Sequence, residues 1–207
     1  MCTTWVNQCR AVAAGSAAAS AAVRVEKVAD NSWSLTGSAC TLLAPAQVTA
    51  ADVRARAVRL IPSASVGVAP HTATLVNIQT VMWANTPAIR ELPAVAILGR
   101  RVTIGIKIDH VDWRFGDGVS ATTHDAGQSY DGARHPCRTV TCPGYFGHVY
   151  TATGAVRVSA TVSWVATFRV DGGATQTIPG AIAGPTAQTP LQVKEARGVL
   201  VPNPGEH

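Results

Sequence analysis

Charged side chains are scarce in this chain of 207 residues, since Asp, Glu, Lys and Arg together make up only 14% of it. Hydrophobic residues account for 47%, so the composition is that of a globular protein and excludes a disordered one. So low a charge content suits an extracellular or assembled protein. No apolar run is long enough to cross a bilayer as a helix, so we expect no membrane span.

The chain also lacks a stripe of Lys and Arg interleaved with aromatic residues. Its formal net charge of +5 comes from arginines scattered singly or in pairs, and aromatic residues make up only 5% of the sequence. No nucleic-acid partner is therefore expected. The charge is a mild basic bias that is compatible with an anionic cell envelope.

Signals of catalysis and of cofactors are missing as well. The sequence has no glycine-rich phosphate loop and no alternation of strands with helices, which argues against a doubly wound α/β enzyme. Nothing in it resembles the nucleophile elbow of a hydrolase. We predict no catalytic residues and no cofactor.

Two sets of candidate metal ligands can be drawn, and neither has the expected pattern. Calcium needs six or more oxygen ligands, and no Asp-rich loop is present, so turn stabilisation explains Asp117 better. The spacing of the two central cysteines is not that of a zinc knuckle. We predict no metal site from Asp112, Asp117 and Asp125 for calcium, or from His135, Cys137, Cys142 and His148 for zinc.

The five cysteines are the best indication of the compartment. Cys137 and Cys142 lie in a turn-rich segment between two prolines, and the short loop lets their sulfurs meet, so we predict a disulfide. The alternative is a pair of free thiols in a reducing cytoplasm. Cys9 and Cys40 are a second candidate pair, which leaves Cys2 odd. The Ala-rich stretch from residue 11 to 23 lacks the cationic start of a signal peptide. If the protein is exported, we therefore expect its native leader to be absent from this chain.

The chain divides into three expected parts. We expect residues 1–73 to form a β-rich N-terminal extension with the Ala-rich segment and one short helix over 48–60, where Val53, Ala57 and Leu60 recur at helical spacing before Pro62. Residues 74–201 carry strand signals, and residues 202–207 are a tail. The clearest strand signal is the alternation from Val156 to Val170, which predicts one long strand, or two strands bent at a bulge, with a continuous buried face.

Two local motifs flank the cysteine-containing segment. The first, Trp113-Arg114-Phe115-Gly116-Asp117-Gly118, is a strand that ends in a Gly-Asp-Gly turn. The second places His148 and Tyr150 before the turn residue Gly154 and the long alternating strand. In this order the two motifs resemble those of polycystic kidney disease (PKD) domains, and the whole sequence is similar to PKD-containing secreted or surface proteins of high-GC bacteria.

This resemblance covers about a third of the chain and implies an extracellular immunoglobulin-like antiparallel β-sandwich, which we expect to span residues 74–201. The segment 119–147 between the two motifs is longer than the corresponding segment of a compact PKD domain, and we call it the insertion. Such domains serve as spacers, adhesive units or partner-binding units, which implies a secreted or cell-surface location. The expected inter-sheet core contains Val111, Trp113, Phe115, Val156, Val158, Val162, Trp164 and Phe168.

The sequence therefore leaves two hypotheses for the function. The first is a non-catalytic structural or interaction module that binds a protein partner or a neighbouring copy. The alternative is a carbohydrate-binding module that recognises a glycan through exposed aromatics, for which Trp5 and Trp33 are open candidates, while Trp83 fits core packing better. An exposed aromatic platform would favour the glycan, and an apolar patch or a shared strand edge would favour protein assembly.

Overall fold

The structure is a computed structural model that describes residues 20–27, 33–41 and 47–197, of which the first two ranges are described as backbone strands only. Its contacts divide the chain into two compact units, Met1–Thr49 and Ala50–His207. In the first unit β1 (Ser20–Lys27) and β2 (Trp33–Thr41) pair as an antiparallel ladder with an irregularity between Arg24 and Val25. The two units are described separately below.

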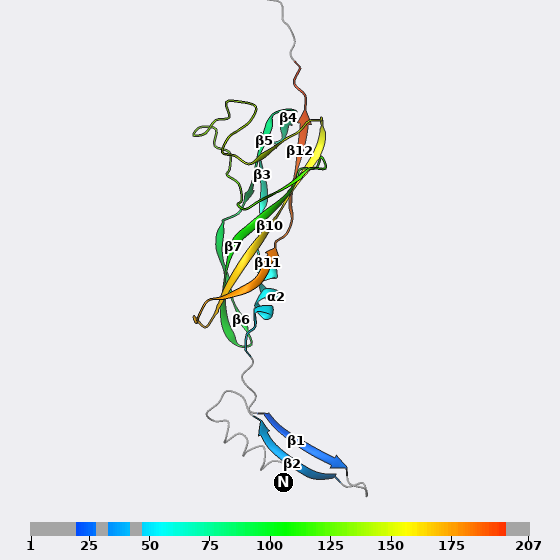
Figure 1. Ribbon diagram of the computed structural model, residues 1–207, viewed down its shortest axis with the longest axis vertical. Helices are drawn as coiled ribbons and strands as arrows, with labels where there is room; N and C mark the ends of the chain where they lie inside the picture. The colour runs from blue at the N-terminus through cyan, green and yellow to red at the C-terminus, as the bar shows by residue number, and fades with distance from the viewer. Residues whose placement is uncertain (1–19, 28–32, 42–46, 198–207) are drawn as a thin grey trace, which may run out of the picture. The chain divides into compact units, whose positions relative to one another are not determined.

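The second unit is mainly β with one short helix among its described residues (Figure 1). The elements are α2 (Ala50–Leu60), β3 (Ser65–Ala69), β4 (Ala73–Leu75), β5 (Gln79–Asn85), β6 (Ile89–Ile97), β7 (Arg100–Arg114), β8 (Ser120–Thr123), β9 (Gly147–Val149), β10 (Gly154–Val170), β11 (Gln176–Ala183) and β12 (Ala187–Lys194). A curled sheet has the order β4-β12-β10-β7-β6, with β11 beside β10 and β8 beside β7. All its pairs are antiparallel except β12 with β4, and β3, β5 and β9 form a separate three-stranded antiparallel sheet.

The long central pair β7 and β10 follows from the alternation in the sequence. β10 is a single strand whose residues of even number face inward, and those from Val158 to Phe168 are buried. The opposing register shifts between Ser163 and Trp164, so that β7 carries one extra residue at Asp109. Such a bulge changes which parity of β7 faces inward. Accordingly, Ile108 is buried before the bulge and Val111 after it.

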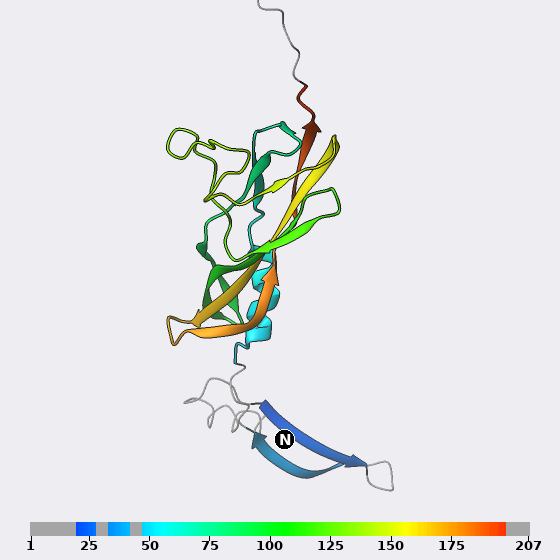
Figure 2. The ribbon, with the colours of Figure 1, turned by 45° about the horizontal axis from the view of Figure 1, so that its top comes forward.

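Seven of the eight expected core residues are buried, and Val156 is only half-buried near the end of its strand. They do not share one inter-sheet layer. β3 packs against β12 and β10, whereas α2 packs against β11 and β6, beside the part of the sheet that carries Trp164 and Phe168 (Figures 1 and 2). The buried face of the central strands is therefore covered by a sheet over one part and by a helix over the other.

The short helix begins two residues later than expected, at Ala50, and ends at Leu60 as expected. Its buried residues Val53 and Ala57 are those expected from the helical spacing. The contacts of α2 place it in the same compact unit as the sheets, and this unit begins in the sequence at Ala50, whereas the sandwich was expected to begin at residue 74. The helix was assigned to the extension because local periodicity gives no information on distant packing partners.

Candidate functional site

The two sequence motifs lie in direct contact, and together they form what we call the motif cluster: Phe115, Asp117, His148 and Tyr150. Asp117 Oδ2 lies 2.6 Å from His148 Nε2, across 31 residues of sequence. The His148 ring stacks on the ring of Phe115 with centroids 4.1 Å apart and planes only 2° from parallel. The Tyr150 hydroxyl donates a hydrogen bond of 3.0 Å to the carbonyl oxygen of Phe115.

A tight turn after β7 positions Asp117 in this cluster. Gly116 has a φ of +87°, and a Cβ at this position would lie 2.7 Å from the backbone nitrogen of Arg157 at the start of β10. Only glycine fits both the conformation and the space. The other carboxylate oxygen of Asp117 accepts a hydrogen bond of 3.1 Å from the amide of Val119 and closes the turn.

The pKa shifts and hydrogen bonds of the cluster fit a role in stabilising the fold better than a role in a chemical reaction. Partial burial raises the pKa of Asp117, but the hydrogen bonds from His148 and Val119 outweigh it and leave that pKa below its ordinary value. Burial, with the charge of Asp117 as a smaller cause, raises the pKa of Tyr150 far above its ordinary value. The phenol therefore stays protonated and acts as a donor to Phe115. Each polar group of the cluster stabilises the fold by holding the two motifs together.

The candidate metal ligands are dispersed or already bonded. Cys137 and Cys142 form a disulfide with their Cα atoms 4.9 Å apart. Asp112 accepts a hydrogen bond from Thr122, and Asp125 accepts one from the amide of Gly127. Among residues 47–197 no group of three or more His, Cys, Asp or Glu side chains is arranged to hold a metal ion. Of the second candidate pair, Cys9 lies outside the described residues and Cys40 is described only as backbone of β2.

The disulfide cross-links two residues of the insertion, and hydrogen bonds to Gln79 at the start of β5 attach the insertion to the sheet. The Gln79 amide donates to the Val140 carbonyl at 2.8 Å, its side-chain oxygen accepts from the Cys142 amide at 2.8 Å, and its side-chain nitrogen donates to the Tyr145 carbonyl at 3.0 Å. Figure 2 shows the insertion running beside β5. The backbone and the side chain of Gln79 thus hold the insertion to the sheet within the disulfide loop, at Cys142 and just after it.

Two cavities adjoin the disulfide. The first, of about 340 Å³, lies between the insertion and the strands β3 and β5, and the second, of about 270 Å³, lies on the insertion itself. Tyr130 in the wall of the first is 37% exposed, and nearby in the insertion Val140 is 60% exposed. The first cavity is lined by Ala69, Pro70, Ile78, Gln79, Val81, Tyr130, Cys137, Thr139 and Cys142, and the second by Arg134, His135, Pro136, Cys137, Cys142, Pro143 and Tyr145.

The tryptophans do not form an exposed platform in the described part of the chain. Trp113 and Trp164 are fully buried, and Trp83 is half-buried, with its ring lying over Gly67, where a Cβ would be 2.1 Å from Trp83 Cε2. Trp5 lies outside the described residues, and Trp33 is described only as backbone of β2. Tyr130 of the insertion is an exposed aromatic residue that lines a cavity, and no local pattern around it indicated such a position.

Gln79 and Phe146 were missed by sequence reasoning altogether. Phe146 packs on Trp113 with centroids 5.0 Å apart, but it has no strand pattern around it. Gln79 stands at the start of a strand, where a glutamine carries no sign of a role. Both act through contacts with residues distant in sequence, which no local pattern reports.

The comparisons with known proteins add no relative: no protein-family model matches the chain, and no curated protein matches it significantly. No helix among the described residues is long and apolar enough to cross a membrane. Any functional role therefore has to follow from the chemistry and geometry of this chain's own residues.

Proposed function

We propose that this protein is a non-catalytic, secreted or cell-surface interaction module with a PKD-like, immunoglobulin-like β-sandwich, and that it binds a protein partner through its insertion. The mainly β fold and the contacts between the two PKD-like motifs support the domain type. The Cys137–Cys142 disulfide supports an oxidising location outside the cell. The cavity beside Tyr130 supports the binding role, and it is the observation on which the proposal depends.

Rigidity is the first reason to choose the insertion. Loops that are already ordered lose little conformational entropy on binding, so their contacts contribute more fully to affinity. The insertion combines a disulfide with three hydrogen bonds to Gln79, and Ala126 accepts another from the Ala84 amide at 2.7 Å. Its cavity is therefore presented in one shape.

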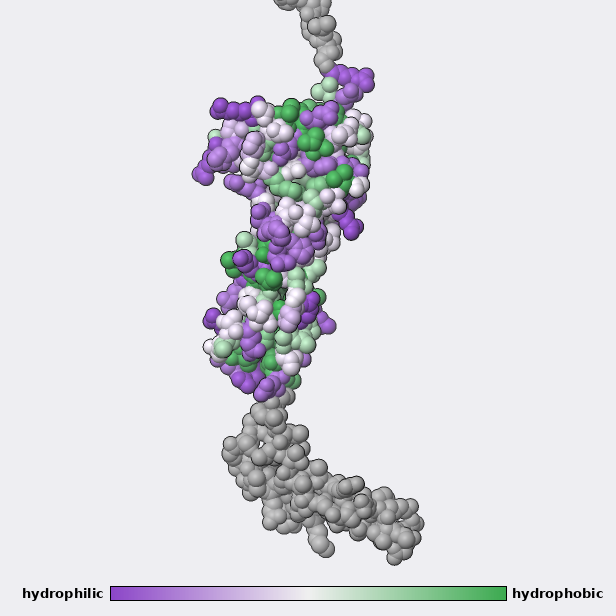
Figure 3. Space-filling view, viewed as in Figure 1, coloured by the Kyte–Doolittle hydropathy of each residue, from purple (hydrophilic) through white to green (hydrophobic). Residues whose placement is uncertain are grey.

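Two of the edge strands, β11 and β6, are less suitable for assembly with a neighbouring copy. Arg54 of α2 donates hydrogen bonds to the carbonyls of Pro179, Gly180 and Ala181, which occupies the free edge of β11. β6, at one end of the sheet, contains Pro93, which has no amide hydrogen to donate to an added strand. Figure 3 also shows hydrophobic residues scattered among hydrophilic ones over the face it presents, rather than one large apolar patch.

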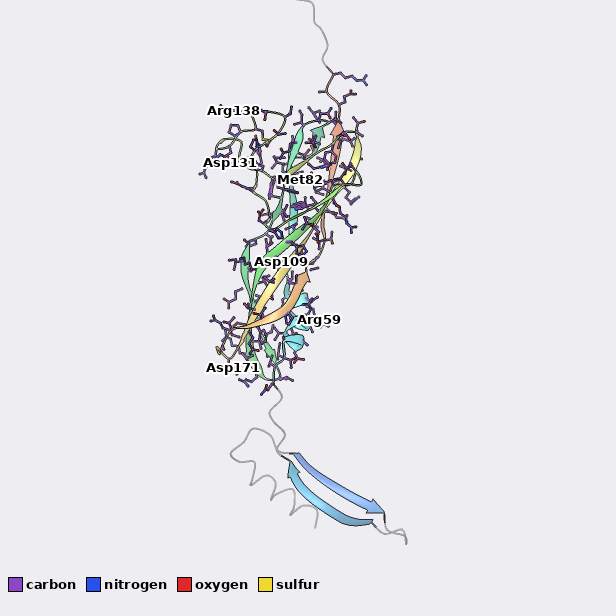
Figure 4. All side chains as sticks on the ribbon, viewed as in Figure 1. Arg59, Met82, Asp109, Asp131, Arg138 and Asp171 are labelled. Carbon is purple, nitrogen blue, oxygen red and sulfur yellow. A yellow bond between two sulfur atoms is a disulfide. The ribbon has the colours of Figure 1, made fainter. Side chains whose placement is uncertain are left out.

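The residues that line the two cavities indicate which chemical groups a partner would present to them. The first has an apolar wall of aliphatic side chains, a tyrosine ring and the disulfide, which suits a large apolar side chain. The second is lined by Arg134 and His135, and Arg138 lies on the same loop as Asp131 (Figure 4). A protein segment with an apolar anchor next to an acidic residue fits both.

A selection from displayed random peptides on the oxidised full chain tests this proposal. We expect the selected peptides to share a large apolar residue near an acidic one. Their affinity should fall at least about tenfold with Tyr130→Ala, because exposed aromatic anchors contribute most to such interfaces. The matched control is Ile89→Ala, which removes a 70% exposed apolar side chain from β6. Equal affinities for wild type and Tyr130→Ala would refute the proposed site.

A further inference from the structure

A polar groove of about 900 Å³ crosses four neighbouring strands on the outer face of the curled sheet, and it shares no lining residue with the two cavities beside the disulfide. Its polar side chains stand in two rows that follow the register of β8, β7, β10 and β12. The first row, the bonded row, is Thr122, Asp112, Thr161 and Thr186; the second, the free row, is Ser120, Arg114, Ser159 and Gln188.

The rows differ in how far their hydrogen-bonding groups are used. In the bonded row Thr122 donates to Asp112 at 2.8 Å, and the hydroxyls of Thr161 and Thr186 lie 2.7 Å apart. In the free row no side chain forms a hydrogen bond or an ion pair with the described part of the chain. The free row thus offers a guanidinium, an amide and two hydroxyls to a ligand.

The mixture of groups indicates the ligand class. An anion would call for several cations and a divalent metal for several carboxylates, but the lining has one of each, Arg114 and Asp112. Hydroxyl and amide groups both donate and accept, and they repeat at about 5 Å across the strands and about 7 Å along them. Such an array matches a neutral ligand that carries many hydroxyls at regular intervals.

We propose that this groove binds a neutral oligosaccharide through hydrogen bonds from the free row, without an aromatic stacking platform. The volume is at the upper end of those of ligand sites, which suits a chain of several sugar units rather than one. The hydrogen bonds within the bonded row already order that part of the groove before a ligand binds. Binding therefore loses less conformational entropy. This site includes β8 of the insertion but none of the residues that line the two cavities beside the disulfide, so the failure of either proposal leaves the other standing.

Titration of the isotope-labelled full chain with cellotetraose, chitotetraose and mannotetraose, followed by amide chemical shifts, tests the inference. With each sugar raised to about 10 mM, dissociation constants in the millimolar range are detected. We expect at least one sugar to shift the amides of β7, β8, β10 and β12 around the groove. No shift with any of the three would overturn the inference.

The matched variants are Gln188→Leu and Gln192→Leu, two glutamines of β12 that have the same parity and are both exposed, of which only Gln188 lines the groove. We expect Gln188→Leu to weaken sugar binding about fivefold to tenfold, as for the loss of one or two hydrogen bonds, and Gln192→Leu to leave it unchanged. Arg114→Leu should weaken it by at least as much. Sugar binding that is equal in all three variants would place it elsewhere and contradict the inference.

Discussion

Substitution of Gly116 by alanine tests whether the close approach of the Gly-Asp-Gly turn to β10 holds the fold together. The residue has a φ of +87°, and an added Cβ would lie 2.7 Å from the backbone nitrogen and 2.8 Å from the backbone oxygen of Arg157. Neither atom belongs to a flexible side chain, so the turn and β10 would have to separate.

The expected loss in the free energy of unfolding has two contributions. A left-handed conformation costs an alanine roughly 1 to 2 kcal/mol relative to glycine. Separation of the turn from β10 adds an overpacking cost of about 1 to 3 kcal/mol. We therefore expect Gly116→Ala to lower the free energy of unfolding by about 3 kcal/mol.

Gly118 in the same turn provides the control. Its φ is +94°, but a Cβ there would meet no atom within 4 Å. Gly118→Ala should therefore carry the conformational cost alone, about 1 to 2 kcal/mol. The difference between the two variants isolates the close approach to Arg157.

The assay is urea unfolding followed by tryptophan fluorescence, since Trp113 of β7 and Trp164 of β10 are buried and report on the packing of the central strands. The midpoint should fall furthest for Gly116→Ala, with an unchanged dependence on urea. Equal losses in the two variants would show that the contact with Arg157 adds nothing, and the reasoning about this turn would be refuted.

Three further predictions concern the core, the motif cluster and the disulfide. Trp164→Ala should lower the free energy of unfolding by about 3 to 5 kcal/mol in the same assay, and a loss below about 1 kcal/mol would contradict the burial of Trp164. Because the pKa of Asp117 is lowered in the fold, its contribution is present at neutral pH and is lost as the pH falls through that pKa; the destabilisation by Asp117→Asn should therefore be larger at about pH 6 than at about pH 3, and a pH-independent difference would count against the pair with His148. Replacement of both Cys137 and Cys142 by serine should leave the melting temperature nearly unchanged but speed amide hydrogen exchange within the insertion, and unchanged exchange there would show that the disulfide does not hold it.

Elements that depend on local periodicity were predictable from the sequence. The alternation from Val156 to Val170 corresponds to β10, and the helical spacing around Val53 and Ala57 corresponds to α2. The bulge at Asp109 had a visible signal as well, because the apolar positions of β7 change from even to odd numbers between Ile108 and Val111. Each of these patterns lies within one element, where side-chain direction repeats with a fixed period.

Contacts between distant elements were not predictable in the same way. The packing of α2 on β11 joins residues more than 100 positions apart, as the hydrogen bonds from Arg54 to Pro179 and its neighbours show. The anchoring of the insertion by Gln79 and the two rows of the polar groove also depend on how strands pair. A single sequence contains the residues of these sites but not their register.

The motif cluster is an intermediate case. The resemblance to PKD domains selected Phe115, Asp117, His148 and Tyr150 together, and the structure brings all four into contact. The cavity beside Tyr130 had no comparable motif. Its walls come from β3, β5 and the insertion, and only the disulfide that closes it was indicated by the sequence.

The most direct test of the central claim is to locate a selected peptide on the oxidised protein by amide chemical-shift mapping. The account predicts the largest shifts at Ile78, Tyr130, Thr139 and their neighbours, around the cavity between the insertion and the strands β3 and β5. Shifts confined to the polar groove, to β6 or to the face of α2 would show that the cavity beside Tyr130 is not the docking site, and would contradict the account.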